Sequence, residues 1–185
     1  MSEYDFMLKR IKKLIINVPD FPKPGILFKD ISPIFTNQSE LGNLIKAQAR
    51  FIKKDGRDFD KIVAIESRGF LLGSLLAYET GLPLILARKA GKLPREVVHQ
   101  DYGLEYGKDR IEIHKDDINR DDHVLIVDDV LATGGTATAV GNIIDALEAK
   151  VAGFWFLMEI KELGGQDELI NRFPDINASD IEVVL

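Results

Sequence analysis

The amino-acid sequence predicts an α/β protein in which a central parallel sheet is flanked by helices. Short apolar runs rich in β-branched residues alternate with segments of helical spacing from residue 61 onward, and this alternation is typical of parallel strands joined by crossover helices. The 185 residues are also enough for one such domain, which would bury about 70% of the surface of the unfolded chain. We therefore expect a single domain over residues 1–185.

The first third of the chain is expected to hold two helices separated by an irregular loop. Apolar residues recur at helical spacing over residues 4–18, which predicts the first helix. Several prolines and a glycine between residues 19 and 25 then end it. A second helix is predicted over about 39–54, because Asn37 and Glu40 form the pattern of a capping box before its apolar face.

The rest of the chain alternates between strands and helices. Apolar runs predict buried strands at 61–65, 83–87, 123–127 and 151–160, and helical spacing predicts helices at 69–80 and 136–150. The stretch 89–115 is polar and fits neither pattern, so we expect it to leave the core as a hairpin or a lid. A short helix after residue 165 and an edge strand over 181–185 complete the prediction.

Composition and charge exclude several classes of protein. The chain has no cysteine, so disulfide scaffolds, cysteine-ligated metals and thiol catalysis are excluded. A net charge of −6 and a pI near 5.1 argue against a nucleic-acid or anionic-membrane binder. The longest apolar runs are far shorter than the roughly 20 residues that span a bilayer, and the first residues lack the pattern of a signal peptide. We therefore expect a cytoplasmic protein with no nucleic-acid or membrane partner, while a local site for a small anion stays open.

The richest pattern lies in residues 124–136, with the sequence VLIVDDVLATGGT. Apolar residues predict a strand, Asp128 and Asp129 stand at its carboxyl end, and a loop of small residues leads into a helix. Glycines let the backbone of such a loop approach a ligand, and its amides favour an anion. The predicted phosphate-binding residues are Ala132, Thr133, Gly134, Gly135 and Thr136. The two acids behind them would hold sugar hydroxyls or a divalent cation.

Other glycine-containing motifs fit this stretch less well. A Walker loop requires lysine after its second glycine, where this chain has Thr136, and the dinucleotide-binding pattern G-x-G-x-x-G does not occur. The plain alternative is a strand–turn–helix junction with Asp128 and Asp129 in solvent. Because the strand, the acids, the loop and the helix all agree with anion binding, the pattern favours a phosphate site.

This stretch resembles the binding motif for phosphoribosyl pyrophosphate (PRPP) in the type I phosphoribosyltransferases. Further similar segments follow in the order of that family, and the resemblance covers residues 18 to about 157. The supporting segments are 20–33 (DFPKPGILFKDISP), 66–70 (ESRGF), 88–94 (RKAGKLP) and 102–107 (YGLEYG). The first and the last of them are typical of the adenine branch of the family.

The resemblance implies a fold and an activity. The fold would be that of the type I phosphoribosyltransferases, with a core over about residues 36–170, a base-binding hood from residues 1–35 and a lid from the 89–115 excursion. The activity would be transfer of the phosphoribosyl group of PRPP to adenine, which gives AMP and pyrophosphate and salvages the purine. Mg²⁺ would arrive on PRPP rather than bind directly to a protein site.

The resemblance also assigns roles to single residues. Glu105 matches the general acid/base that moves a proton on the purine, and Tyr106 matches a tyrosine of the lid. Pyrophosphate is assigned to Ser67, Arg68, Arg88, Lys89 and Lys92; ribose and 5′-phosphate to Asp128, Asp129 and the loop 132–136; and adenine to Leu27, Phe28, Lys29 and Leu131, with the base between Phe28 and Leu131. Position 29 commonly carries arginine in the family, and the point charge of Lys29 cannot copy a planar guanidinium.

Simpler explanations exist for each of these segments. The cations of residues 88–95 can form a solvated charge run, and Ser67 can cap the helix that follows it. Glu105 can be a solvated loop acid and Phe28 an ordinary core residue. Against the first of these, arginine and lysine beside glycine and proline at a strand end, in an otherwise acidic protein, favour a mobile phosphate-binding segment.

Two other functions and the assembly stay open. One is a phosphoribosyltransferase for a 6-oxopurine, and the other is a regulatory module that senses PRPP or a purine without turnover. A homodimer is implied by the resemblance. The apolar character of residues 69–80 on nearly all sides and the aromatic residues at 154–156 agree with a dimer, although a monomer of this size can bury them as well.

Overall fold

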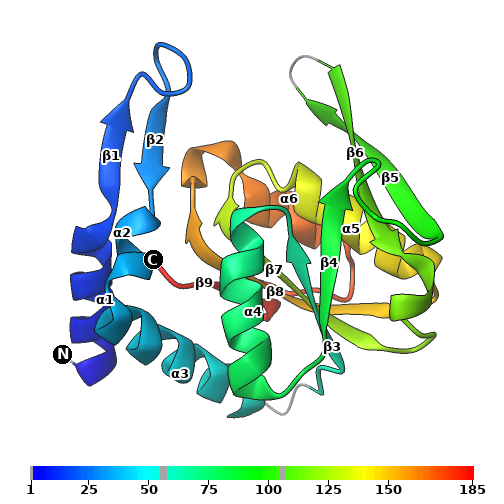
Figure 1. Ribbon diagram of the computed structural model, residues 1–185, viewed down its shortest axis with the longest axis horizontal. Coiled ribbons are helices and arrows are strands. Elements are labelled where there is room, and N and C mark those ends of the chain that lie inside the picture. Colours follow the sequence, from blue (N-terminus) through cyan, green and yellow to red (C-terminus); the bar gives the residue numbers. More distant parts are fainter. Residues whose placement is uncertain (1, 55–57, 105–106) are drawn as a thin grey trace.

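The fold is organised around one large sheet. In the computed structural model, which describes residues 2–54, 58–104 and 107–185, seven strands form this sheet in the order β5-β6-β4-β3-β7-β8-β9 (Figure 1). The strands from β4 through β3, β7 and β8 to β9 run parallel, whereas β5 and β6 form an antiparallel hairpin that joins the sheet through β4. The predicted α/β fold with a mostly parallel central sheet is confirmed.

The elements follow one another as helix, hairpin and then alternating strands and helices. In chain order they are α1 (Glu3–Leu14), β1 (Ile16–Pro19), β2 (Leu27–Asp30), α2 (Ser32–Thr36), α3 (Gln38–Lys54), β3 (Lys61–Ile65), α4 (Arg68–Thr80), β4 (Leu84–Lys89), β5 (Val97–Leu104), β6 (Gly107–His114), β7 (His123–Leu131), α5 (Gly135–Ala146), β8 (Lys150–Glu159), α6 (Gly165–Arg172) and β9 (Ile181–Val183). None of the helices in this described part of the chain is both long and apolar enough to cross a bilayer.

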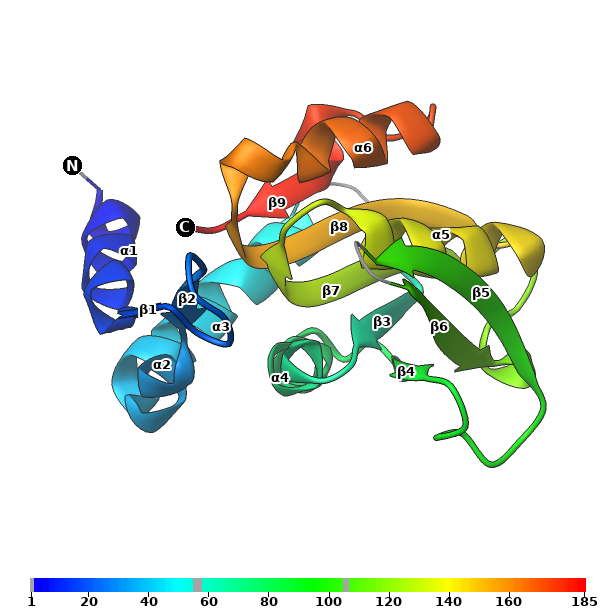
Figure 2. The same ribbon diagram turned by 90° about the horizontal axis from the view of Figure 1, so that it is seen from above.

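Helices cover both faces of the sheet and divide the core into two clusters (Figure 2). On one face, α4 packs against the sheet, α3 packs beside α4, and α1 packs on α3, with residues such as Ile11, Leu44 and Leu72 in one cluster. On the other face, α5 and α6 contribute residues such as Val140 and Leu169. Alternate residues of the central strand β7 enter the two clusters, as expected for a strand that is buried on both sides.

The N-terminal helix is shorter than its apolar spacing predicts. Helix α1 ends at Leu14, and residues 16–19 form β1, which pairs antiparallel with β2. This small two-stranded sheet stands apart from the main one. The pairing between residues far apart along the chain decides this boundary, because the apolar spacing of residues 4–18 alone continues the helix.

Residues 89–115 form the expected hairpin, but they do not leave the core. Strands β5 and β6 extend the main sheet, and Ile111 and Ile113 of β6 are buried beneath α5. The stretch looks polar in the sequence because its other face carries charged residues. Figure 1 shows that the β1-β2 hairpin and the β5-β6 hairpin rise on opposite sides of the carboxyl edge formed by β3, β4 and β7.

Candidate active site

The loop that the sequence predicts to bind phosphate, residues 132–136 and called the phosphate loop below, lies at the carboxyl edge of the sheet, between β7 and α5. Strand β7 continues past the two acids to Leu131, where it still pairs with Glu159 of β8, so the loop proper begins at Ala132. Gly134 adopts a left-handed conformation with φ of 83° at the start of α5, which favours glycine there. Residues 132–136, together with Asp128, line a hollow of about 70 Å³. Their amides and the start of α5 can therefore surround a small anion.

The start of α6 supports this loop from below. A Cβ atom at Gly165 would overlap the carbonyl oxygen of Ala132 and would lie 2.8 Å from side-chain atoms of Leu131. A Cβ atom at Gly134 would likewise lie 3.0 Å from the carbonyl oxygen of Gly165, so the loop and the start of α6 are packed closely on each other. The sequence alone presents Gly164 and Gly165 only as a turn before a short helix. No local signal marks Gly165 as a support, because its partner lies in another part of the chain.

Asp128 and Asp129 are held at the base of the site. The amide of Asp129 donates to Oδ1 of Asp128 over 2.8 Å, and Nε of Arg68 lies 2.7 Å from Oδ2 of Asp129. A Cβ atom at Gly69 would lie 2.8 Å from Oδ1 of Asp128, so the first turn of α4 packs directly against this carboxyl. Only 5% of Asp129 is exposed to solvent.

Burial sets the electrostatics of the two acids. It raises the pKa of Asp128 well above its usual range, and the charge of Asp129 raises it further. Burial also raises the pKa of Asp129, although the guanidinium of Arg68 opposes this effect. Two adjacent carboxyls that resist ionisation create a place where added positive charge is stabilised, whether on a sugar or on a metal ion.

The cations predicted to bind pyrophosphate gather at the ends of β3 and β4. Nε of Arg88 lies 3.4 Å from Oε2 of Glu66, the amide of Lys89 donates to the same oxygen over 3.0 Å, and Nζ of Lys92 pairs with Oε1 of Glu66. Nζ of Lys89 lies 2.9 Å from Oδ2 of Asp109. The structure therefore brings Arg88, Lys89 and Lys92 together, and it reveals two acidic partners that the sequence analysis missed.

Ser67 and Arg68 lie between these cations and the two acids. Ser67 directly follows Glu66 in the chain, and Arg68 pairs with Asp129. The peptide bond between Glu66 and Ser67 is cis. The Ser67 side chain is exposed and makes no capping hydrogen bond to α4 within the described residues, so the simpler capping role is not realised. Arg95, which had no assigned role, pairs with Asp117 at 2.8 Å, away from the cluster.

The hood reaches the site through Phe28. The guanidinium of Arg68 lies 5.2 Å from the centroid of the Phe28 ring, and the Phe21 ring packs edge-on against it at 5.1 Å. Leu27 is half exposed at the same end of β2. Lys29 donates from Nζ to Oδ1 of Asn17 across the hairpin over 2.6 Å, so its charge is directed at β1 rather than at the ring of Phe28.

Leu131, which the resemblance assigns to one face of the base, is almost completely buried in this structure. Its side chain is 1% exposed and packs in the core cluster on the α5 face, against the start of α6. Phe28, in contrast, contacts Arg68 and Phe21. Leu131 therefore supports the phosphate loop in this conformation and has almost no surface to offer a base. Glu105 and Tyr106, the predicted acid/base and lid residues, lie outside the described residues.

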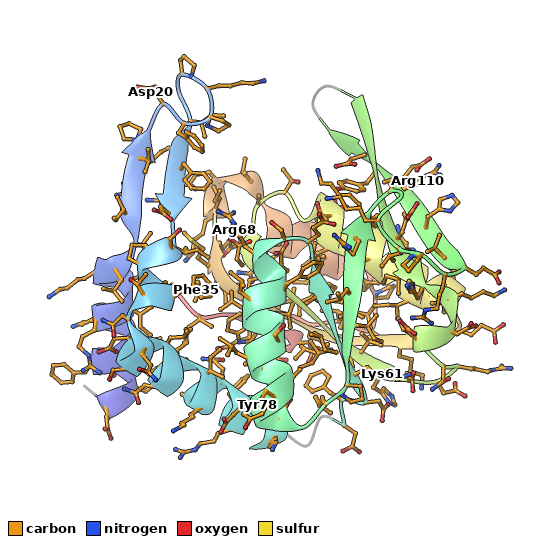
Figure 3. The ribbon with its side chains drawn as sticks, viewed as in Figure 1. Asp20, Phe35, Lys61, Arg68, Tyr78 and Arg110 are labelled. Atoms are coloured by element: carbon orange, nitrogen blue, oxygen red, sulfur yellow. The ribbon has the colours of Figure 1, made fainter. Side chains whose placement is uncertain are left out.

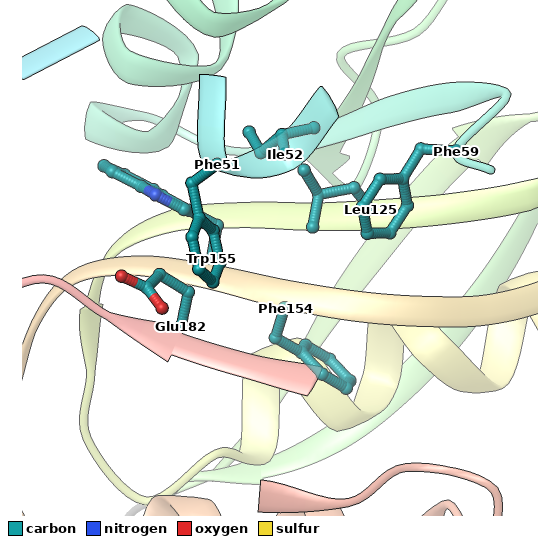
Figure 4. Close-up of a pocket in the computed structure, with 7 residues that line it drawn as sticks. All are labelled: Phe51, Ile52, Phe59, Leu125, Phe154, Trp155 and Glu182. Atoms are coloured by element: carbon teal, nitrogen blue, oxygen red, sulfur yellow. The ribbon is translucent and has the colours of Figure 1, made fainter. Parts of the chain in front are cut away.

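A second cavity in the core is unsuited to a substrate. It lies between α3 and the sheet, where Leu125 of β7 and Trp155 of β8 line it together with Phe51 and Phe59 (Figure 4). Its volume of about 10 Å³ is roughly that of one water molecule. It also lies near the amino end of β7, away from the carboxyl edge where ligands of parallel sheets bind.

Fold and site together define the class of protein. The mostly parallel sheet carries a glycine-containing loop, two acids and a cluster of cations at one edge, and residues 33–181 match the family model of the phosphoribosyl transferase domain. The sequence is 46% identical over 159 residues to an adenine phosphoribosyltransferase of Methylobacillus flagellatus, which covers 86% of this chain and 89% of that one. The chain belongs to the adenine phosphoribosyltransferase family.

Solved structures agree with this assignment. The crystal structure of adenine phosphoribosyltransferase from Thermoanaerobacter pseudethanolicus matches with a TM-score of 0.87 and 42% identity, over 96% of this chain and 98% of that chain. The enzyme from Saccharomyces cerevisiae, complexed with an imino-altritol bisphosphate and adenine, matches with a TM-score of 0.87 and 38% identity, over 98% of this chain and 99% of that chain.

Proposed function

We propose that this protein transfers the phosphoribosyl group of PRPP to adenine and releases AMP and pyrophosphate, a step of purine salvage. The observation that carries the proposal is the phosphate loop at residues 132–136 with Asp128 and Asp129 directly behind it, in a chain of the adenine phosphoribosyltransferase family. In the reaction, the bond between ribose carbon 1 and pyrophosphate breaks, nitrogen 9 of adenine bonds to carbon 1, and a proton leaves the base.

The loop and the acids would hold the two ends of the phosphoribosyl group. The amides of residues 132–136 take the 5′-phosphate, and the hydroxyls of Thr133 and Thr136 add donors. Asp128 and Asp129 accept hydrogen bonds from the ribose hydroxyls. As pyrophosphate departs, the sugar gains positive charge, and two adjacent buried carboxyls stabilise that charge more than they stabilise the neutral ground state.

The remaining residues would orient the leaving group and the base. Ser67, Arg68, Arg88, Lys89 and Lys92 are the proposed pyrophosphate-binding residues. The backbone of Leu27 reads the amino edge of adenine and the ring of Phe28 packs on its face. Lys29, which is paired with Asn17, contributes charge at the edge of the hood. Glu105 takes the proton from the base, and Tyr106 steadies the lid.

The residues of the site fit Mg²⁺ that is carried by PRPP. Mg²⁺ typically uses one or two carboxylates and completes its coordination with substrate phosphates and water. Asp128 and Asp129 are the carboxyls available for this. When bound, Mg²⁺ supplies charge neutralisation to the departing pyrophosphate.

A homodimer is proposed on the outer face of α4. Leu71 and Tyr78, about two helical turns apart, are 51% and 87% exposed, and Leu86 of the neighbouring strand β4 is 37% exposed. Figure 3 shows Arg68 at the first turn of α4 and Tyr78 at its last. A second copy on this face would fix the helix whose first turn carries Arg68 and packs on Asp128. The cytoplasmic location stays a prediction.

An assay of base specificity tests the proposed activity. The purified chain is incubated with PRPP, Mg²⁺ and, in separate reactions, adenine, guanine, hypoxanthine and xanthine. We expect AMP formation, with each 6-oxopurine at least about 10²-fold slower, because a site that pairs with an amino group leaves polar groups unpaired against a carbonyl. Faster turnover of hypoxanthine than of adenine would support a 6-oxopurine enzyme. PRPP binding without turnover of any base would support a regulatory module.

A further inference from the structure

One carboxylate holds most of the turn that carries the pyrophosphate-binding cations. Oε2 of Glu66 accepts hydrogen bonds from the amide of Lys89 over 3.0 Å and from Nε of Arg88 over 3.4 Å. Oε1 of Glu66 accepts from Nζ of Lys92. Nη1 of Arg88 also donates to the carbonyl oxygen of Lys92 over 3.1 Å, which closes the turn around the carboxylate. A backbone amide, a guanidinium and an ammonium are the donors with which proteins bind phosphate.

The backbone of the sheet fixes Glu66 in this place. Its amide donates to the carbonyl oxygen of Ala87 in β4 over 3.0 Å, so residue 66 continues the ladder between β3 and β4. Its side chain is 10% exposed, whereas those of Arg88 and Lys92 are 31% and 46% exposed. The carboxylate thus lies beneath the cations, and their other faces remain open to solvent.

Glu66 stays ionised around neutral pH. Burial raises its pKa, but the hydrogen bonds from Lys92 and from the amide of Lys89, together with the charges of Lys92 and Arg88, outweigh burial and leave the pKa below its usual range. The negative charge is therefore present whenever the enzyme meets its substrates.

We propose that Glu66 is a positioning residue that occupies the pyrophosphate-binding turn as an internal anion and competes with pyrophosphate for Arg88 and Lys92. The inference rests on the proposed function, because it takes these two cations as ligands of pyrophosphate. While the site is empty, Glu66 keeps the turn assembled and its cations neutralised. When pyrophosphate binds, the exposed faces of Arg88 and Lys92 turn to it and the hold of Glu66 weakens, so Glu66 lowers pyrophosphate affinity and speeds product release.

The Glu66→Gln variant separates competition from a purely structural role. Glutamine keeps the size of the side chain and an oxygen for the amide of Lys89, but it removes the charge. If Glu66 competes, inorganic pyrophosphate with Mg²⁺ binds about tenfold more tightly in isothermal titration calorimetry, the KM for PRPP falls, and kcat falls when product release limits it. A merely structural Glu66 would instead leave a disordered turn that binds pyrophosphate more weakly.

Matched variants complete the experiment. Asp117→Asn removes the same charge from the exposed pair with Arg95, outside the site, and should leave pyrophosphate affinity within about twofold of wild type. If Glu66→Gln does not fold, Glu66→Asp, whose shorter side chain withdraws from Lys92, is expected to bind about threefold more tightly.

Equal or weaker pyrophosphate binding by a folded Glu66 variant, relative to wild type, overturns the proposal. A tightening that Asp117→Asn reproduces also overturns it, because net charge would then be the cause. If wild type itself binds neither pyrophosphate nor PRPP, the proposed function fails together with this inference. Normal binding by wild type with no tightening in the variants removes only the inference.

Discussion

Replacing Gly165 by alanine is expected to impair PRPP binding although Gly165 itself is not predicted to touch PRPP. In the structure, the added Cβ would overlap the carbonyl oxygen of Ala132, the first residue of the phosphate loop. It would also lie 2.8 Å from two side-chain atoms of Leu131. Leu131 is held in the core and the oxygen of Ala132 belongs to the backbone, so neither can move away by a simple side-chain rotation. The loop or the start of α6 must shift instead.

The size of the effect follows from this overlap. Restoring an ordinary contact between the new carbon and the carbonyl oxygen requires a shift of roughly 1 Å. A displacement of about 1 Å at a group that positions a substrate costs on the order of 10²-fold in rate. We therefore expect kcat/KM for PRPP to fall about 10²-fold. Overpacking of this kind also costs about 1–3 kcal/mol of folding free energy, which corresponds to roughly 2–12 °C in Tm for a chain of this size.

Steady-state kinetics with varied PRPP and thermal melts of the same samples check this prediction. Gly153→Ala is the matched control, because its Cβ would lie 3.0 Å from another backbone oxygen, that of Asp180, near the amino end of β8. The control should lower Tm and leave kcat/KM for PRPP close to wild type. If Gly165→Ala lowers Tm but keeps kcat/KM within about threefold of wild type, the reasoning that Gly165 positions the loop is refuted.

Three further predictions concern the proton, the acids and the assembly. Glu105→Gln should leave PRPP affinity intact while kcat falls about 10²–10⁴-fold, because glutamine cannot exchange the proton. If kcat, measured as the rate of AMP formation, falls less than about threefold, Glu105 is not the general acid/base. Asp128→Asn should weaken PRPP binding but raise Tm at pH 7. Burial raises the folded pKa of Asp128, so the stability it contributes when protonated is lost as pH rises through that pKa, and the gain in the variant should vanish below about pH 4. Unchanged melting at both pH values would contradict this. Light scattering should give twice the 20.7 kDa of one chain for wild type and a single chain for Leu71→Glu with Tyr78→Glu; monomeric wild type would rule out the dimer.

The phosphate loop could be predicted from the sequence because its parts are neighbours along the chain. The strand that ends in Asp128 and Asp129, the loop of residues 132–136 and the helix after it form one continuous unit, so local spacing is enough to place them at the carboxyl edge of a parallel sheet. The alternation of strands and helices likewise predicted the parallel sheet. The length of the first helix was wrong, since the pairing of β1 with β2 ends it at Leu14.

The sequence by itself therefore determined the class of fold and the position of the loop after β7. Phosphate binding by that loop and pyrophosphate binding by the cations of residues 88–92 stay predictions from the residue types found there. Only the tertiary structure decided which groups meet there. Glu66 and Lys92 are 26 residues apart, and Gly165 lies far along the chain from Ala132, yet each pair is in contact. Periodicity and motif spacing describe residues within a few turns of one another, whereas these contacts depend on how separate strands and helices pack. Packing also buried Leu131 beneath the loop and brought Phe28 to Arg68, so it decides which side chains remain free to meet a substrate.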